Sequence, residues 1–384
     1  MVELLARRAA EGGAILGFGA RPESWQVPRW PTREQIEQVA GGRVLVAWCF
    51  DFHALIASRA ALERAGIHED SADPPGGVLE RDRAGRLTGV VLEKAAGMVW
   101  DALPEPGHDE RRRSVSAAVS NLVAEHGFAE LHDLKSQTWL GPVLADIAHE
   151  LPDVRFFLWP LLGDLERVLE TRARWETDRV RLGGAKIFVD GTLNSRTAWV
   201  LEAYADGRAD HPHGKAMMSQ AEIEDAVRRC DEAGVPLAAH AIGDAAVRAV
   251  LDAIERVQPR TRGFRIEHCE LIDEADVPRF ARLGVIASVQ PCHLLYDVEA
   301  LRRGLPHRLG RVLPLRELID SGLKPGRGVI FGSDVPIVAA DPSDSVQAAV
   351  YRRRRSPGDC EPIAPEQGIS EDEAWACFRS CVDE

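Results

Sequence analysis

The chain of 384 residues contains no apolar run of about 18 residues, the length that a membrane-spanning helix requires. Its first residues, Met1–Arg8, carry charges where a secretory signal peptide has an apolar segment. Together these two absences predict a cytoplasmic protein that has no membrane as a partner.

Positive charge is also scarce. The sequence has 47 Lys and Arg against 60 Asp and Glu, which gives a formal net charge of −13 at pH 7. Nucleic acids and anionic membranes are bound by clustered cations, so this balance argues against both as partners. The one basic run, Arg352–Arg355, is short and is expected to be a solvated helix end.

Cysteine pairing signals are missing as well. The 7 cysteines are odd in number and scattered, and no two of them form a CxxC pair. Neither a disulfide framework nor a zinc site made of thiolates is therefore indicated, and reduced thiols are predicted, several of them buried. The residues are Cys49, Cys230, Cys269, Cys292, Cys360, Cys377 and Cys381.

What the chain has is enough apolar sequence for a large core. It is 45% hydrophobic and 28% charged, which favours one large α/β domain with an appended segment over several small domains. We place the boundary near residue 110. Residues 1–110 are expected to form an irregular α+β insertion region packed on the main fold, and residues 111–384 the main fold itself.

Beyond residue 110 short apolar runs alternate with amphipathic segments, an order typical of parallel βαβ units. Four amphipathic segments are predicted crossover helices: Ser219–Ala233, Ala245–Val257, Glu274–Leu283 and Leu315–Ser321. Seven runs are predicted strands: Phe128–His132, Val154–Trp159, Gly184–Val189, Pro236–His240, Phe264–His268, Val285–Val289 and Val329–Ser333.

A TIM-type (β/α)8 barrel needs eight strands to close, so seven visible strands predict an apparently incomplete barrel or one overlooked strand. Residues 1–110 follow a different rhythm, with a predicted strand at Val44–Trp48 and a hairpin within Val78–Leu92. At the other end of the sequence, Ser370 and Glu373 have the spacing of a helix capping box.

Four polar residues each end an apolar run: Lys186, His240, His268 and Asp334. The carboxyl ends of parallel strands meet at one mouth of a barrel, where imidazole and carboxylate groups can bind a metal. Each residue taken alone has a simpler interpretation, such as a core histidine, a turn aspartate, or an ion pair between Lys186 and Asp190. The two histidines on consecutive predicted strands are harder to explain in that way.

Taken in chain order, the segments resemble the YtcJ-like branch of the amidohydrolase superfamily, the group that contains N-substituted formamide deformylase. Weaker matches run upstream through residues 31–34, 51–54, 73–77 and 131–134, so the resemblance covers nearly the whole chain. The five specific stretches are Lys186–Ala198, His240–Val247, Arg265–Leu271, Ser288–Leu295 and Phe331–Pro336.

This resemblance implies a role for each matching residue. Lys186 corresponds to the carboxylated lysine that bridges metals, His240 and His268 to metal ligands on strands 5 and 6, and Asp334 to the catalytic aspartate of strand 8, which also binds metal. Three further residues, Arg196, His293 and His53, are implied to line the substrate pocket. Phe52 departs from the family pattern, which has Gly there, and its bulk is expected to reshape the pocket entrance near His53.

A further departure concerns the first barrel strand. Family members have a His-x-His pair on strand 1 that holds one metal, followed at the far end by a return to a β-sandwich, and we find neither pattern here. The only pair with that spacing, His211 and His213, lies in a loop region with prolines and glycines. The expected consequence is a complete second metal site and an incomplete first one.

The leading hypothesis is a metal-dependent hydrolase that cleaves carbon–nitrogen bonds other than peptide bonds, in an amide, formamide or cyclic amide, through metal-activated water. Its cofactor is expected to be a divalent metal, zinc above manganese or iron, as one or two ions, and its partner a small-molecule substrate. The alternative is a truncated, non-catalytic remnant or pseudoenzyme that lacks the first metal site. Open strand edges would also favour a homo-oligomer.

Overall fold

The strands beyond residue 110 form two parallel sheets. The structure is a computed structural model that describes residues 1–9, 13–22, 25–103, 107–207, 209–354 and 361–379. All seven predicted strands are present, and one short strand, β8, was missed. The strands are β6 (Glu130–Asp133), β7 (Arg155–Leu158), β8 (Val180–Leu182), β9 (Ala185–Phe188), β10 (Leu237–Ala241), β11 (Arg265–His268), β12 (Ile286–Val289) and β13 (Val329–Phe331).

The spatial order of these strands follows the chain. The sheets have the orders β6-β7-β8 and β9-β10-β11-β12-β13, and every pair in them is parallel. A bridge between Leu161 and Lys186 connects the two sheets. Between β8 and β9, Gly184 passes so close to Trp159 and the Pro236 carbonyl that a side chain there would collide with both. The close approach explains why the chain has glycine at this break.

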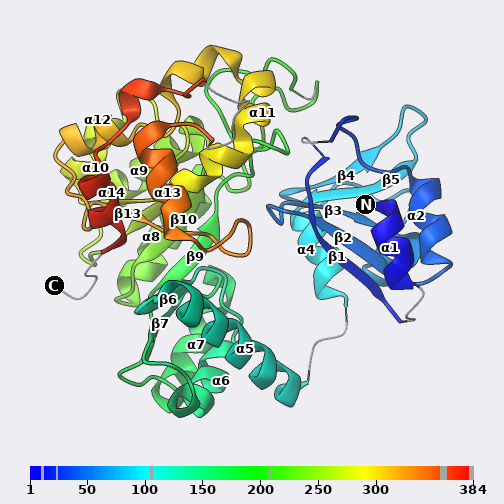
Figure 1. Cartoon of the computed structure of the whole chain (residues 1–384), viewed down its shortest axis with the longest axis horizontal. Helices are drawn as coiled ribbons and strands as arrows, with labels where there is room; N and C mark the ends of the chain where they lie inside the picture. The colour runs from blue at the N-terminus through cyan, green and yellow to red at the C-terminus, as the bar shows by residue number, and fades with distance from the viewer. Residues whose placement is uncertain (10–12, 23–24, 104–106, 208, 355–360, 380–384) are drawn as a thin grey trace.

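Helices cover the outside of the sheets (Figure 1), and the apolar side chains between the two layers make one large core. The four predicted crossover helices are present, although α10 begins three residues later than predicted, with a proline in its first turn. The helices are α5 (His108–His126), α6 (Leu140–Ile147), α7 (Leu165–Thr171), α8 (Gln220–Glu232), α9 (Asp244–Val257), α10 (Val277–Leu283), α11 (Leu294–Gly304), α12 (Leu315–Asp320), α13 (Pro342–Tyr351) and α14 (Glu371–Phe378).

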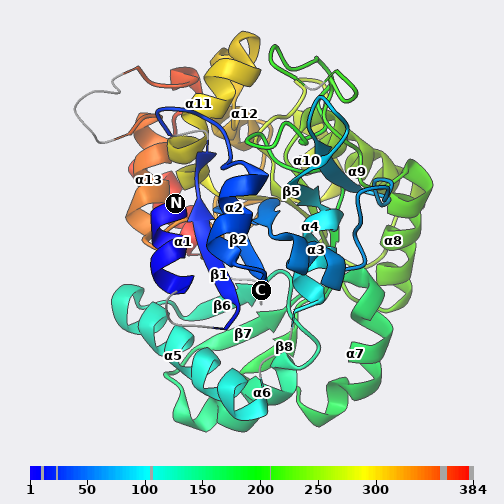
Figure 2. The same cartoon turned by 90° about the vertical axis from the view of Figure 1, so that its right-hand side faces the viewer.

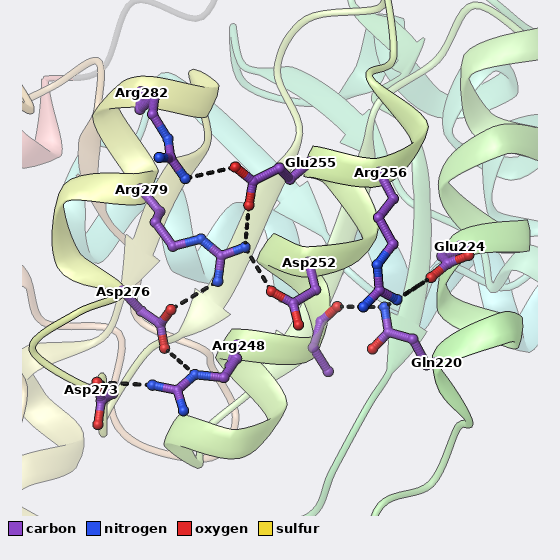
Figure 3. A network of polar contacts seen from close by, with 11 residues as sticks. Gln220, Glu224, Arg248, Asp252, Glu255, Arg256, Asp273, Asp276, Arg279 and Arg282 are labelled. Carbon is purple, nitrogen blue, oxygen red and sulfur yellow. Dashed lines mark hydrogen bonds and ion pairs between the residues drawn. The ribbon is translucent and has the colours of Figure 1, made fainter.

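An ion-pair network holds three of these helices to one another on the outer surface (Figure 3). At its centre Arg279 of α10 donates to Asp252 and Glu255 of α9, each at 2.7 Å, and to Asp276 at 2.8 Å. Arg256 of α9 extends the network to α8. A network that shares one guanidinium among three carboxylates loses less to side-chain entropy than separate surface pairs do.

The N-terminal residues form a separate mixed sheet, of order β1-β2-β3-β5-β4. The predicted strand is confirmed as β2, and the predicted hairpin as β4 and β5, which pair antiparallel. Helices α1 (Val2–Ala9) to α4 (Lys94–Asp101) accompany the sheet. The strands are β1 (Ile15–Ala20), β2 (Leu45–Cys49), β3 (Ala54–Ala57), β4 (Gly77–Arg81) and β5 (Leu87–Glu93), and the two intervening helices are α2 (Arg33–Ala40) and α3 (Arg59–Arg64).

Both faces of this sheet are apolar. One face packs Val46, Trp48 and Leu55 against α3 and α4, while the opposite face buries Ile15 and Ile36 with α1 and α2. The sheet lies beside the parallel strands (Figures 1 and 2). Because β2 pairs with β1 and β3, it does not cover an edge of the parallel sheets.

Arg352 corrects one sequence prediction. It was assigned to a solvated helix end, but its side chain is among the largest fully buried ones in the described residues. Its guanidinium donates to the carbonyl oxygens of Ile363 and Val312. These carbonyls compensate for the lost water, and a charge count of the sequence cannot reveal them. Arg354 pairs with Glu299, while Arg355 lies outside the described residues.

The capping box predicted at Ser370 and Glu373 is confirmed at the start of α14. Two capping boxes that were not predicted begin α2, at Thr32, and α8, at Ser219. None of the helices in the described ranges has the length and apolarity needed to cross a bilayer. Five cysteines are unpaired and buried, whereas Cys360 and Cys381 lie outside the described residues. Short 3-10 turns connect several elements: η2 (Ala148–Glu150), η3 (Leu162–Asp164), η4 (Arg172–Arg174), η5 (Pro291–His293), η6 (Pro306–Arg311) and η7 (Pro365–Gln367).

Candidate metal centre

Strand register places the first polar residues on one side of the five-stranded sheet. His240 of β10 is paired with Phe188 of β9 and with Glu267 of β11, so these three side chains point the same way. Lys186 lies two residues before Phe188 and therefore shares its face. The Lys186 side chain is only 3% exposed.

His268 would point to the opposite face if β11 continued with regular alternation. Its backbone instead has φ 75°, a left-handed conformation that turns the side chain at the end of the strand. The centroid of its ring lies 4.5 Å from that of His240. Such a conformation is strained for a residue with a side chain and is common where a site requires it.

Two further residues, His293 and Asp334, lie beside these two imidazoles, and His293 extends the imidazoles into a row. His293, at the end of η5, stacks on His268 with 5.7 Å between the ring centroids. Its Nε2 atom lies 3.5 Å from Oδ2 of Asp334, which follows β13 and has φ 58°. One ligand atom from each of His268, His293 and Asp334 lies within 4.8 Å of the other two. The structure thus brings together three of the predicted site residues in a ligand-like cluster.

The electrostatics of the row favour neutral imidazoles at two positions. Burial, followed by the charges of neighbouring residues, lowers the pKa of His240 and His268 well below the ordinary value. A neutral imidazole has one nitrogen lone pair for a metal. His268 Nδ1 and His293 Nε2 are buried and make no hydrogen bond within the described residues. These orphaned atoms and the nearby carboxylate fit a divalent cation.

His293 differs from the other two histidines. Burial opposes its charge, but Glu270, with an oxygen 3.7 Å from Nδ1, and Asp334 raise the pKa of His293 to about 9. Asp297 completes a second cluster with Glu270 and His293, and burial raises the pKa of Asp297 to about 8. The two clusters share His293, so they form one connected site.

Lys186 lies within the electrostatic reach of this site. Burial lowers the pKa of Lys186 to about 8, although Glu267 and Asp334 oppose the shift. The predicted alternative of an ion pair with Asp190 is wrong. Asp190 accepts backbone N–H groups from residues 199, 242 and 243 and lies 3.6 Å from Nε2 of His240.

The N-terminal region contributes His53 to the same place. Its ring centroid is 5.0 Å from that of His240, and its Nδ1 atom lies 2.6 Å from a carboxylate oxygen of Glu93. Burial opposes a charge on His53, but Glu93 raises the pKa of the imidazole. Glu93, Glu270 and Asp297 also lie at the site, although they were not among the residues predicted from the sequence. The clearest sequence signal was Glu270, two residues after His268.

Arg196 and Phe52 contact residues outside the row of imidazoles. The guanidinium of Arg196 makes two bonds of 2.7 Å with Asp206, and the residue lines a cavity of about 1360 Å³ that neither His240 nor Asp334 lines. Phe52 packs on Trp48, with 5.6 Å between ring centroids. Its φ of 56° explains why glycine suits this position.

The Amidohydrolase family matches residues 1–380, and the chain belongs to this family. It is 27% identical over 355 residues to the putative amidohydrolase YtcJ of Bacillus subtilis, covering 90% of this chain and 66% of the relative. It is 26% identical over 407 residues to N-substituted formamide deformylase of Arthrobacter pascens, covering 98% of this chain and 71% of the relative. The chain thus spans about two thirds of the length of these curated relatives.

Solved structures agree on the fold. An uncharacterized metal-dependent hydrolase from Pyrococcus horikoshii superimposes with a TM-score of 0.73 at 24% identity, covering 97% of this chain and 73% of that one. The match extends through the N-terminal sheet as well as the parallel strands. This likeness establishes a common α/β fold with parallel sheets.

Proposed function

We propose that the chain is a metal-dependent hydrolase. Its proposed metal ligands are Lys186, His240, His268 and Asp334, with His293 as a further ligand. The observation that carries the proposal is the cluster of His268, His293 and Asp334, whose ligand atoms lie within 4.8 Å of one another while two buried imidazole nitrogens have no hydrogen-bond partner among the described residues. Membership of the Amidohydrolase family supports the same interpretation.

Lys186 is proposed to bind as a carbamate. Its buried amine has a pKa of about 8, so a neutral fraction with a free lone pair exists near neutral pH. The amine nitrogen adds to the carbon of carbon dioxide and releases one proton, which leaves a carboxylate on the lysine. An anionic oxygen ligand suits zinc, the metal that we propose above manganese and iron.

A bound divalent cation supplies Lewis acidity, which polarises a carbonyl oxygen and lowers the pKa of water. Asp334 is the proton carrier in this proposal. Its carboxylate is 34% exposed, so it can reach both a water molecule and a substrate. The protein around it removes part of its hydration, which raises the pKa of Asp334 and favours proton uptake. Asp334 takes the proton of the attacking water and gives it to the leaving nitrogen.

The proposed substrate is a small molecule with a non-peptide carbon–nitrogen bond, such as an amide, formamide or cyclic amide. Hydrolysis places the hydroxyl of water on the carbonyl carbon and a proton on the nitrogen. The support comes from the relative in Arthrobacter pascens that is named for deformylation of N-substituted formamides. We propose His53 and Arg196 as substrate contacts, His53 from its place beside His240.

We further propose that residues 111–384 form a barrel in which β8 and β9, paired with β7 and β10 respectively, share one strand position, and in which a position between β6 and β13 is not filled by the described residues. Strands β6 and β13 each pair on one side only within the described ranges. Residues 1–110 are the insertion region, and an open edge favours a homo-oligomer. The alternative function is a truncated, non-catalytic remnant or pseudoenzyme that has lost the first metal site, because both clusters of possible ligands found in the described residues share His293 and so suit one ion.

The test is metal analysis of the purified protein. We expect about one or two zinc ions per chain, and strong loss of metal in Lys186→Ala and His240→Ala. Two exposed positions give matched controls, Lys324→Ala and His149→Ala, which should keep the wild-type content. If all five proteins contained the same metal, or none, the proposed site would be wrong and the non-catalytic alternative would be favoured.

A further inference from the structure

Glu93 connects the N-terminal sheet to the loop that follows β9. It is the last residue of β5 and is buried, and both of its carboxylate oxygens are bound. One oxygen lies 2.6 Å from Nδ1 of His53, and the other accepts the hydroxyl hydrogen of Thr197. Its backbone has φ 58° and ψ −128°, which is unfavourable for a residue with a side chain. The contacts on both oxygens hold the residue in this conformation.

Thr197 organises the loop of residues 191–197. Its hydroxyl donates to Glu93 and accepts the backbone N–H of Thr192 at 3.0 Å. Its carbonyl oxygen accepts the N–H of Gly191 at 3.2 Å, and its own N–H donates to the Thr192 carbonyl at 3.0 Å. These bonds fix the position of Gly191 at the start of the loop.

Gly191 contacts His240 directly. Its carbonyl oxygen lies 3.1 Å from Nε2 of His240. A carbonyl can only accept, so Nε2 carries the hydrogen of the neutral imidazole and Nδ1 keeps the lone pair. A side chain at position 191 would collide with Glu93 and with Thr197, which shows how tightly these residues pack.

We propose that Glu93 and Thr197 are positioning residues for His240: through the Gly191 carbonyl they fix its tautomer and direct Nδ1 to the metal. This inference rests on the proposed metal site and adds that the N-terminal sheet controls its affinity. Partners behind metal-binding histidines typically change metal affinity by about 10- to 100-fold when removed. Three consecutive contacts thus connect Glu93 of one sheet to His240 of another: Glu93 with Thr197, Thr197 with Gly191, and Gly191 with His240.

The experiment is a Co²⁺ titration of metal-stripped full-length protein, followed by visible absorption, with the dissociation constant and the spectrum as readouts. We expect Thr197→Val to weaken binding about 10- to 100-fold and to alter the spectrum, because valine cannot bond Glu93 or Thr192. Thr197→Ser keeps the hydroxyl and should restore both. Thr171→Val, which removes a hydroxyl at the end of an outer helix, is the matched control.

A second pair of variants guards against misfolding at Thr197. Glu93→Ala removes the acceptor and should weaken Co²⁺ binding, whereas Glu93→Gln keeps an oxygen for Thr197 and should bind nearly as the wild type does. Circular dichroism of the stripped proteins reports folding. Folded Thr197→Val and Glu93→Ala that bind Co²⁺ with wild-type affinity and spectrum would overturn the inference. Failure of the wild type itself to bind Co²⁺ would instead overturn the proposed function.

Discussion

The parallel sheets and the N-terminal sheet bury different kinds of side chain. The parallel strands place Lys186, His240 and Glu267 in the interior, whereas the N-terminal sheet buries apolar residues on both faces. The N-terminal sheet reaches the polar site near its strand ends, through His53 and Glu93. In the proposed site, the parallel strands therefore provide the ligands and the N-terminal sheet fixes their surroundings.

The largest expected effect is on metal binding by the parallel strands. His268→Ala removes a ligand at the end of β11, and we expect metal affinity to fall by more than about 100-fold, since even residues behind ligands cost 10- to 100-fold. Isothermal titration of the stripped protein with Zn²⁺ measures this. An affinity within threefold of the wild type would remove His268 from the site and weaken the contrast between the regions.

A change in the core of the N-terminal sheet is expected to lower stability without lowering metal affinity. Trp48 is buried and packs on Phe52 and Trp100. Trp48→Ala should lower the free energy of unfolding by about 3–5 kcal/mol, while the folded fraction keeps its zinc affinity. Urea unfolding and zinc titration check the two statements. A large loss of zinc affinity in folded Trp48→Ala protein would show that the core of this sheet, and not only its strand ends, supports the site.

A smaller effect is expected on the outer surface of the parallel region. Arg279 is 12% exposed and bonds three carboxylates, whereas Arg282 is 60% exposed and bonds one. Arg279→Ala should cost about 2 kcal/mol in the free energy of unfolding, and the matched control Arg282→Ala less than about 0.5 kcal/mol. Urea unfolding at low salt measures both. Equal losses would mean that sharing among carboxylates adds no stability.

The smallest effect concerns the acid stability of α14. Burial by itself raises the pKa of Glu373, but hydrogen bonds from Ser370 and Arg316 more than offset this and lower the pKa below 4.5. The carboxylate therefore stabilises the fold above pH 4.5, and this contribution disappears as the pH falls through the lowered pKa. Glu373→Gln should flatten the decline of thermal stability in that acidic range. An unchanged slope would contradict the assignment.

Much of the parallel region could be predicted from the sequence. Each of its seven predicted strands is a short apolar run, and the ends of several helices are marked by glycine or a capping box. Strand β8 was missed because only Val180, Arg181 and Leu182 belong to it, too few residues for a periodic pattern. The burial of Arg352 was missed for another reason, because its carbonyl partners lie 11 and 40 residues away along the chain.

The site was only partly predictable. His240, His268 and Asp334 could be found because each ends an apolar run, yet the turn of His268 toward His240 depends on a backbone angle that a sequence pattern does not specify. His293 was assigned to a substrate pocket, and its place between His268 and Asp334 became visible only in the structure. Glu93 lies 104 residues before Thr197, so no local pattern connects them.

The most direct test of the proposed metal site is anomalous diffraction at the zinc edge from crystals grown with Zn²⁺. The account predicts an anomalous peak within about 2.0–2.3 Å of ligand atoms from His240 or His268 together with Lys186 or Asp334. A zinc-loaded crystal whose peaks all lie away from these side chains would contradict it.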